Sequence, residues 1–157
     1  MSDPLRQLAL LIRAELTEVE RVLLRLIAGW QRYQSSADDL YLDGIALNLH
    51  GFYGGLERIF EHVATLIDGA KPAGENWHQA LLLQMAAEAP GLRPAVISSA
   101  THKQLDEYRG FRHVARHLYT FNLAPAKVEL LVTKATALFA QVKAELSAFA
   151  DFLDRRA

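Results

Sequence analysis

The sequence contains no cysteine, which excludes disulfide bonds and cysteine-ligated zinc or iron–sulfur sites. It also lacks the run of about 20 apolar residues that a membrane-spanning helix requires. Charged residues interrupt the first apolar segment, at Arg6, Arg13 and Glu15, so we predict neither a signal peptide nor a membrane span. The composition suits a reducing compartment, and we expect a cytoplasmic protein.

An excess of charge of one sign is also missing, because the formal net charge is −1. Global basicity therefore does not indicate nucleic-acid binding, and any contact with RNA has to come from a local patch. A P-loop, a G-x-G-x-x-G fingerprint and a G-x-S-x-G elbow are absent as well. With 157 residues, of which 51% are hydrophobic and 22% charged, the chain is expected to form one globular domain over residues 1–157.

Apolar residues recur at steps of three and four along most of the chain, which predicts amphipathic helices. Capping residues and breakers place their ends. Alternating apolar and polar residues, the pattern of a strand, do not occur over a useful length. We therefore predict an all-α fold, an antiparallel bundle of four or five helices. The expected helices cover about Pro4–Tyr33, Ser35 to Ile67, Trp77–Glu88, a segment beginning near Ser98 or Ser99, and Pro125–Leu153.

Three glycines, Gly51, Gly54 and Gly55, lie inside the second predicted helix. Each costs roughly 1 kcal/mol relative to alanine in a helix interior. Three so close together indicate either a close approach by another helix or a local bend.

The segment from Tyr108 to Tyr119 contains three arginines, two histidines and no lysine. If residues 105–121 form one helix, an apolar face opposes a polar one. An ordinary basic face exposed to solvent would explain this pattern, but arginine together with histidine is the combination that phosphodiester chemistry uses. The apolar face contains Phe111, Val114, Ala115, Leu118 and Phe121, and the polar face contains Arg109, Arg112, His113, Arg116, His117 and Tyr119.

Arg112 and His117 are five residues apart, which is about 140° around an ideal helix. The two side chains would not reach one phosphate from a regular helix. Either a distortion at Gly110 or near Asn122 brings them together, or a second subunit supplies a copy of the segment and forms a composite cleft in a homodimer.

The second predicted helix has a polar stripe, and we favour its interpretation as an edge facing solvent or another subunit. The alternative is that His50 or Glu57 supports the Arg/His segment. A metal site from His50, Glu57 and a histidine of the Arg/His segment is possible in composition, but no tight ligand spacing supports it, so we expect no metal. His62, His78 and His102 are interpreted as surface or capping residues, and Trp30 and Trp77 as core or interface residues. The stripe contains Asp39, Asp43, Ala46, His50, Tyr53, Glu57 and Glu61.

The order Arg112, four residues, His117, one residue, Tyr119 resembles the R-x4-H-x-Y motif of the HEPN superfamily, and within it the HepT-like toxins. The stretch from Leu42 to Glu61, the Trp77-His78 helix, Arg93-Pro94 and Phe111-Arg112-His113 are also similar to HepT-like proteins. The resemblance extends from about residue 5 to residue 155.

This resemblance implies a HEPN-like helical fold and a metal-independent endoribonuclease that needs no cofactor. Arg112 would bind the scissile phosphate, and His117 would act as general base or acid for attack by the ribose 2′-hydroxyl. The partner would be an MNT-type nucleotidyltransferase antitoxin, which can transfer AMP to the tyrosine of the motif, here Tyr119. Arg109, His113 and Arg116 are expected to bind substrate.

An alternative is a non-catalytic HEPN-like module, in which the Arg/His segment holds a nucleotide phosphate or a nucleotidyltransferase partner. A purely structural bundle would leave the Arg/His segment unexplained. Growth arrest on expression of the chain alone separates the first two possibilities, because a passive module should be tolerated.

Overall fold

The computed structural model describes residues 3–117, 119 and 122–157 of the chain. Within this part of the chain, helices account for the regular structure, and the only β-type pairing is an isolated bridge between Ala89 and Arg93. The prediction of an all-α fold is confirmed. The elements are α1 (Pro4–Ser36), α2 (Leu40–Val63), the π-helical turn η1 (Ala64–Asp68), α3 (Trp77–Met85), α4 (Ser99–Ala115) and α5 (Pro125–Arg156). None of the described helices is long and apolar enough to cross a membrane.

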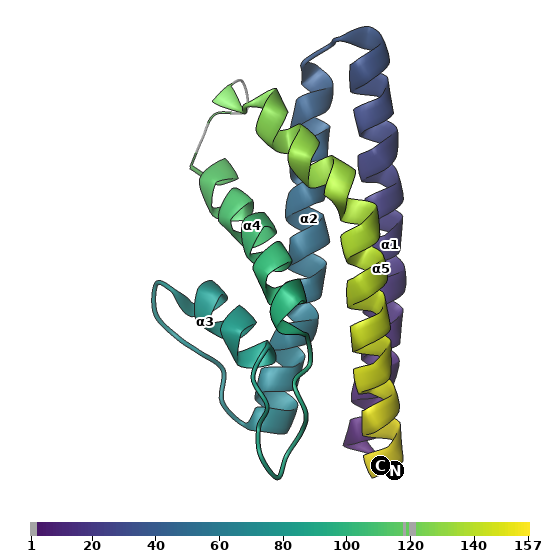
Figure 1. The fold of residues 1–157 in the computed structure, drawn as a ribbon, viewed down its shortest axis with the longest axis vertical. Coiled ribbons are helices and arrows are strands. Elements are labelled where there is room, and N and C mark those ends of the chain that lie inside the picture. Colours follow the sequence, from purple (N-terminus) through teal and green to yellow (C-terminus); the bar gives the residue numbers. More distant parts are fainter. Residues whose placement is uncertain (1–2, 118, 120–121) are drawn as a thin grey trace.

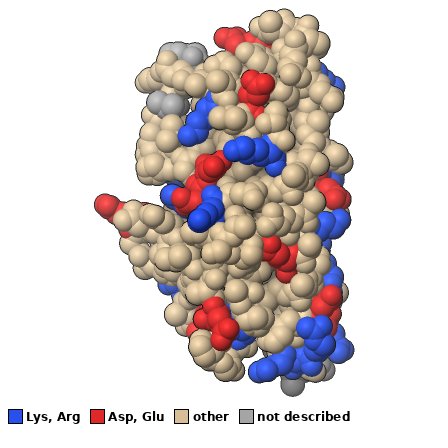
Figure 2. All heavy atoms as spheres, in the orientation of Figure 1, with Lys and Arg blue, Asp and Glu red and all other residues tan. Residues whose placement is uncertain are grey.

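Three long helices, α1, α2 and α5, form the body of the bundle, and α4 lies along α2 on another side (Figure 1). The short helix α3 packs against α2 and α4, and the two termini lie at the same end of the molecule (Figure 1). All five α-helices contribute to one cluster of buried apolar side chains. Charges of both signs are scattered over the face drawn in Figure 2, as the small net charge leads one to expect.

The boundary between α1 and α2 differs from the predicted one. The hydroxyl of Ser36 donates to the carbonyl oxygen of Arg32 at 2.7 Å, and α1 continues to Ser36 before Ala37 takes a left-handed conformation with φ of 55°. The amide of Leu40 donates to the Asp38 carboxylate at 3.0 Å. The two serines therefore belong to the end of α1, and Asp38 satisfies a free amide at the start of α2.

At Gly55 helix α1 approaches α2 closely. A Cβ atom at this position would lie 2.6 Å from Cγ2 of Val19 on α1, well inside the contact distance of two carbon atoms. At Gly51 the corresponding distance, to Cγ1 of Val22, is an ordinary 3.7 Å. Of the two explanations for the glycines, close approach by another helix is confirmed at Gly55.

Two sets of polar contacts fix the position of α4. The hydroxyl of Ser98 accepts a hydrogen bond from the Thr101 amide and so caps the helix. Glu145 on α5 accepts from the Ser98 amide at 2.6 Å and from the Thr101 hydroxyl at 2.7 Å. At the start of the Arg/His segment, the hydroxyl of the buried Tyr108 donates to the carbonyl oxygen of Leu131 at 2.6 Å. These bonds anchor α4 on α5 at two levels.

The buried Arg93 fixes the connection between α3 and α4. Its Nε and Nη2 atoms donate to the two oxygens of Asp68, each at 2.7 Å, and its Nη1 donates to the carbonyl oxygens of Ala87 and Pro94. Burial raises the pKa of Asp68, but hydrogen bonds from Arg93 and Gln84 and the charge of Arg93 outweigh it and lower the pKa overall. The end of η1 is thereby tied to the segment that follows α3.

We predict that Gly55→Ala destabilises the protein. The added methyl group requires α1 and α2 to separate or Val19 to move, and overpacking of this kind costs typically about 1–3 kcal/mol. Gly44→Ala is the matched control, because its Cβ would meet nothing within 4 Å and alanine is the better helix former. Urea unfolding followed by circular dichroism should give a lower free energy of unfolding for Gly55→Ala and an equal or higher one for Gly44→Ala. Equal stability of the two variants would contradict the close contact.

Candidate active site

Helix α4 ends at Ala115, before the second histidine of the Arg/His segment. The amide of His117 donates to the carbonyl oxygen of Val114 at 3.0 Å, so the chain leaves the helix through a tight turn. The supposition of one helix over residues 105–121, whose end the sequence left open, therefore does not hold, because α4 ends at Ala115. Val114, placed on the apolar face by that expectation, is 49% exposed, while Phe111 is buried. Leu118 and Phe121 lie outside the described residues.

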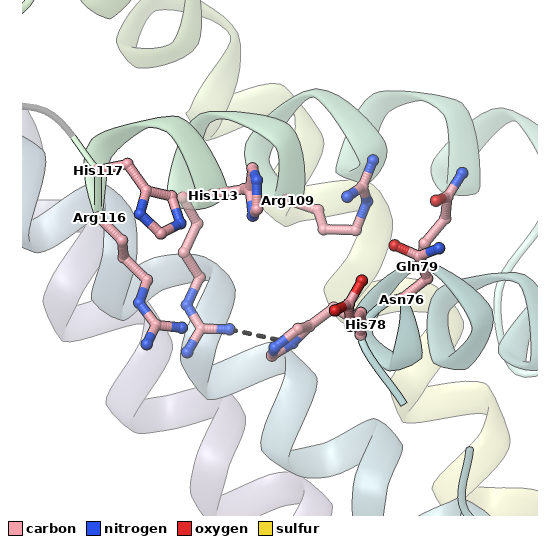
Figure 3. A pocket seen from close by; sticks show the side chains of 9 residues that line it. Asn76, His78, Gln79, Arg109, His113, Arg116 and His117 are labelled. Carbon is pink, nitrogen blue, oxygen red and sulfur yellow. Dashed lines mark hydrogen bonds between the residues drawn. The ribbon is translucent and has the colours of Figure 1, made fainter. Parts of the chain in front are cut away.

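A pocket between α3 and α4 collects the polar residues of the Arg/His segment (Figure 3). Residues of α4 and the turn after it enter the pocket from one side, and His78 and Gln79 of α3 lie on the other (Figure 3). Arg112 and His117, which a regular helix would hold apart, line the same pocket within one chain. The lining residues are Glu75, Asn76, His78, Gln79, Arg109, Arg112, His113, Arg116 and His117.

At the base of the pocket, a buried carboxylate joins three helices. Glu57 on α2 is 3% exposed. Its Oε1 accepts from Nη1 of Arg112 on α4 at 2.8 Å, and its Oε2 lies 2.7 Å from Nδ1 of His78 on α3. Nε of Arg112 donates to Nε2 of His50 at 3.0 Å. The guanidinium of Arg112 is thus held in place by two residues of α2.

The hydrogen bonds decide the tautomers of both histidines. An ionised carboxylate only accepts, so His78 carries its proton on Nδ1 and donates it to Glu57. The 3.3 Å approach of Arg112 Nη1 to the same nitrogen is then a contact between two donors. His50 must keep Nε2 unprotonated to accept from Arg112, and it is therefore neutral with its proton on Nδ1.

The polar stripe of α2 faces inward at its centre. Ala46, Tyr53 and Glu57 are buried, so the favoured interpretation of the stripe as an edge facing solvent or another subunit is wrong for these three residues. Ion pairing explains the difference, because a carboxylate can be buried where a guanidinium and a hydrogen-bond donor meet it. Burial raises the pKa of Tyr53, and the neighbouring Glu57 adds to this effect. His50 is half-buried in contact with Arg112.

His78 was predicted to be a surface or capping residue, and this is wrong. Its side chain is 25% exposed, bonded to Glu57 and stacked on Trp77, with 3.6 Å between the ring centres. The residues it contacts on α2 and α4 are 21 and 34 positions away, so no local spacing pattern could reveal them. The signal available in the sequence was the likeness of the Trp77-His78 helix to HepT-like proteins.

The other residues predicted to bind substrate surround the network. Nε of Arg109 donates to Asp106 at 2.6 Å, one helical turn earlier. The rings of His113 and His117 meet edge to face at 5.0 Å between centres. Tyr119 follows the turn and is 74% exposed. The site therefore presents three guanidinium groups and three imidazoles around one opening, an arrangement suited to an anionic ligand.

Metal-ligand geometry is not found in the described part of the chain: no three His, Asp or Glu side chains there are arranged to hold a metal ion. His50 and Glu57, which we considered as metal ligands, both contact Arg112 instead.

A family model described as HepT-like protein matches residues 44–153, which is more than half of the chain. The matched range includes most of α2, all of α3 and α4, the whole Arg/His segment and most of α5. Comparisons with curated proteins and with solved structures gave no match.

We predict that His50 makes the stability of the protein pH-dependent. Burial lowers the pKa of His50, and the positive charges of Arg112 and Arg116 lower it further. In the unfolded chain His50 has the ordinary histidine pKa of about 6.5. At a pH between this value and the lowered pKa of the folded state, the unfolded chain therefore binds a proton at His50 and the folded protein does not. Stability should fall as the pH drops through about 6.5 and level off below the lowered pKa of the folded state.

Urea unfolding of the wild type and His50→Gln at about pH 7.5 and pH 5.5 tests this. Glutamine offers Arg112 an acceptor but does not titrate in this range. The free energy of unfolding should decrease less on acidification in His50→Gln than in the wild type, while His102→Gln, outside the pocket, serves as the control. The same decrease in the wild type and His50→Gln would contradict the prediction.

Proposed function

We propose a function for this chain, which belongs to the HepT-like protein family. The proposal is that it is a metal-independent endoribonuclease, the toxin of a toxin–antitoxin pair. The observation that supports it best is the pocket in which Arg112 and His117 lie together with Arg109 and Arg116. Guanidinium groups complement the charged oxygens of a phosphodiester, and an imidazole exchanges protons near neutral pH.

In this proposal Arg112 binds the scissile phosphate. Its Nε and Nη1 are used by His50 and Glu57. Nη2 finds no acceptor among the described residues, so its two hydrogens are available to phosphate oxygens. Because the guanidinium is fixed before substrate arrives, little reorganisation is needed when negative charge develops on the phosphate.

His117 is proposed to take the proton of the ribose 2′-hydroxyl. The 2′-oxygen then bonds to phosphorus, the bond from phosphorus to the 5′-oxygen breaks, and the leaving 5′-oxygen takes up a proton, so the products are a cyclic phosphate and a 5′-hydroxyl. No water, metal or cofactor enters this step. Arg109, His113 and Arg116 are proposed to bind neighbouring phosphates or bases of the RNA.

Two partners complete the proposal. The first is a second copy of the chain: we propose a homodimer in which the pocket opens into the cleft between the subunits. The second partner is an MNT-type nucleotidyltransferase antitoxin that transfers AMP to Tyr119. The exposure of Tyr119, two residues from His117, supports this assignment. An AMP group there would add negative charge and bulk beside the site and compete with RNA for the arginines.

We predict that purified protein cleaves RNA in excess EDTA and that His117→Ala lowers the cleavage rate by about 10²–10⁴-fold, the usual contribution of a general acid or base. Gel analysis of labelled RNA, with identification of cyclic-phosphate ends, measures both. Arg112→Lys should lose most of the activity as well, because lysine keeps the charge but cannot make the two hydrogen bonds that Nε and Nη1 make. Arg112→Ala is the less suitable variant, because it removes the charged partner of the buried Glu57 and would destabilise the protein.

His62→Ala is the matched control, because His62 is exposed on α2 and does not line the pocket. It should retain wild-type activity and should arrest growth when expressed without the antitoxin. Equal cleavage by the wild type and His117→Ala would indicate a contaminating nuclease. That result, or no cleavage by a wild type whose Tyr119 is unmodified by mass spectrometry, favours the non-catalytic module.

We predict that incubation with the nucleotidyltransferase partner and ATP adds one AMP to the chain at Tyr119 and abolishes RNA cleavage. Tyr119→Phe should keep cleavage and resist both changes, and Tyr41→Phe, which removes another exposed tyrosine, should behave as the wild type. Peptide mass spectrometry locates the AMP. Modification of Tyr119→Phe to the same extent would overturn the assignment.

A further inference from the structure

The pocket contains a histidine outside the R-x4-H-x-Y motif that is oriented by a buried carboxylate. Nδ1 of His78 donates to Oε2 of Glu57 at 2.7 Å, and Glu57 is held in turn by Arg112 at 2.8 Å. The remaining nitrogen of His78, Nε2, is the one available to a ligand. A carboxylate that fixes the tautomer and orientation of an imidazole is the arrangement found where histidine transfers protons.

The position of His78 suits proton transfer on the side of the phosphate opposite to His117. His117 enters the pocket from the turn after α4, and His78 enters it from α3 (Figure 3). Nη1 of Arg112, the proposed phosphate ligand, lies 3.3 Å from Nδ1 of His78. A phosphate bound by Nη2 of Arg112 would therefore share one pocket with both imidazoles.

A structural role alone does not require histidine here. Glu57 already has a charged partner in Arg112, and an asparagine could supply the second donor. The ring is packed on Trp77, which fixes its plane, yet 25% of the side chain remains exposed to the pocket. A titratable group that is held in place and still accessible is the combination that acid–base catalysis requires.

We propose that His78 is a second catalytic residue, the general acid that protonates the leaving 5′-oxygen. This inference rests on the proposed function. We assign the acid to His78 because its Nδ1 donates to the Glu57 carboxylate, a contact that favours the protonated imidazole even though Arg112 shares the same carboxylate. His117 is then the base.

The protons and bonds balance between the two histidines. The reaction starts with His117 neutral and with His78 protonated on both nitrogens, so that Nδ1 keeps its bond to Glu57 and Nε2 carries the second proton. His117 takes the proton from the 2′-hydroxyl as the bond from the 2′-oxygen to phosphorus forms. The bond from phosphorus to the 5′-oxygen breaks, and Nε2 of His78 gives its proton to that oxygen. The enzyme ends with His117 protonated and His78 neutral, and exchange with solvent restores the starting state.

Two substrates with different leaving groups test this role. The first is a short oligoribonucleotide that spans a cleavage site mapped with the wild type. The second is the same oligonucleotide with sulfur in place of the bridging 5′-oxygen at that site. A thiol has a pKa near 8.5 and leaves as the thiolate, so the sulfur substrate needs no general acid.

We expect His78→Asn, which keeps a donor for Glu57 and cannot titrate, to cleave the oxygen substrate about 10²–10⁴-fold more slowly than the wild type. The same variant should cleave the sulfur substrate within about tenfold of the wild-type rate. His117→Ala should be slow on both, because the base is still needed. The pH–rate profile of His78→Asn on the oxygen substrate should also lose its basic limb, where the acid of the wild type becomes deprotonated.

Each alternative result has a distinct meaning. Cleavage of the oxygen substrate by His78→Asn at a rate close to that of the wild type overturns the inference and leaves the proposed function intact. An equal loss of rate on both substrates also overturns the inference and leaves the proposed function intact, because it shows that His78 positions Arg112 and does not protonate the leaving oxygen. Failure of the wild type to cleave either substrate overturns the proposed function itself and, with it, the role of His78.

Discussion

The carboxylate of Glu57 is the group on which the arrangement of the site depends. A charge buried to this extent is tolerated only where partners meet both oxygens, and removing one partner of a buried ion pair costs about 3–5 kcal/mol. Arg112 and His78 are these partners, and they come from α4 and α3. Because α2 contributes both Glu57 and His50, one helix holds the guanidinium of Arg112 and orients the imidazole of His78. The three helices are thus fixed relative to one another at the point where the chemistry is proposed.

The end of α4 is the second constraint. In a helix that continued through residue 121, Arg112 and His117 would diverge by about 140°. The helix instead stops at Ala115, and the turn that follows brings His117 to the pocket that Arg112 already lines. Helix α4 is hydrogen-bonded to α5 at two places. Thr101, near the start of α4, bonds to Glu145, and Tyr108, near its middle, bonds to the carbonyl oxygen of Leu131. These bonds hold the body of α4 in place while its last residues serve the site.

The pocket lies apart from most of the hydrophobic core, so most residues that stabilise the fold are not residues that form the site. The close contact of Gly55 with Val19 joins α1 to α2 on a side of α2 that does not line the pocket. Arg93 and Asp68 secure the connection after α3 by a buried ion pair of their own. By contrast, Glu57 and Arg112 serve both purposes, since they bury charge and shape the pocket. Conservative substitutions at these two positions are therefore the informative ones.

The sequence by itself determined the all-α class, the approximate ends of most helices and the concentration of arginine and histidine before Tyr119. Periodicity, caps and glycines are local signals, and local signals are sufficient for those features. Only the tertiary structure decided that Glu57 is buried, that His78 belongs to the pocket and that His117 lies beyond the end of α4. The physical reason is that a charged side chain in a sequence is expected to be exposed, unless partners on other helices compensate the cost of burying its charge. The partners of Glu57 are 21 and 55 positions away in the sequence, so no local pattern reveals them.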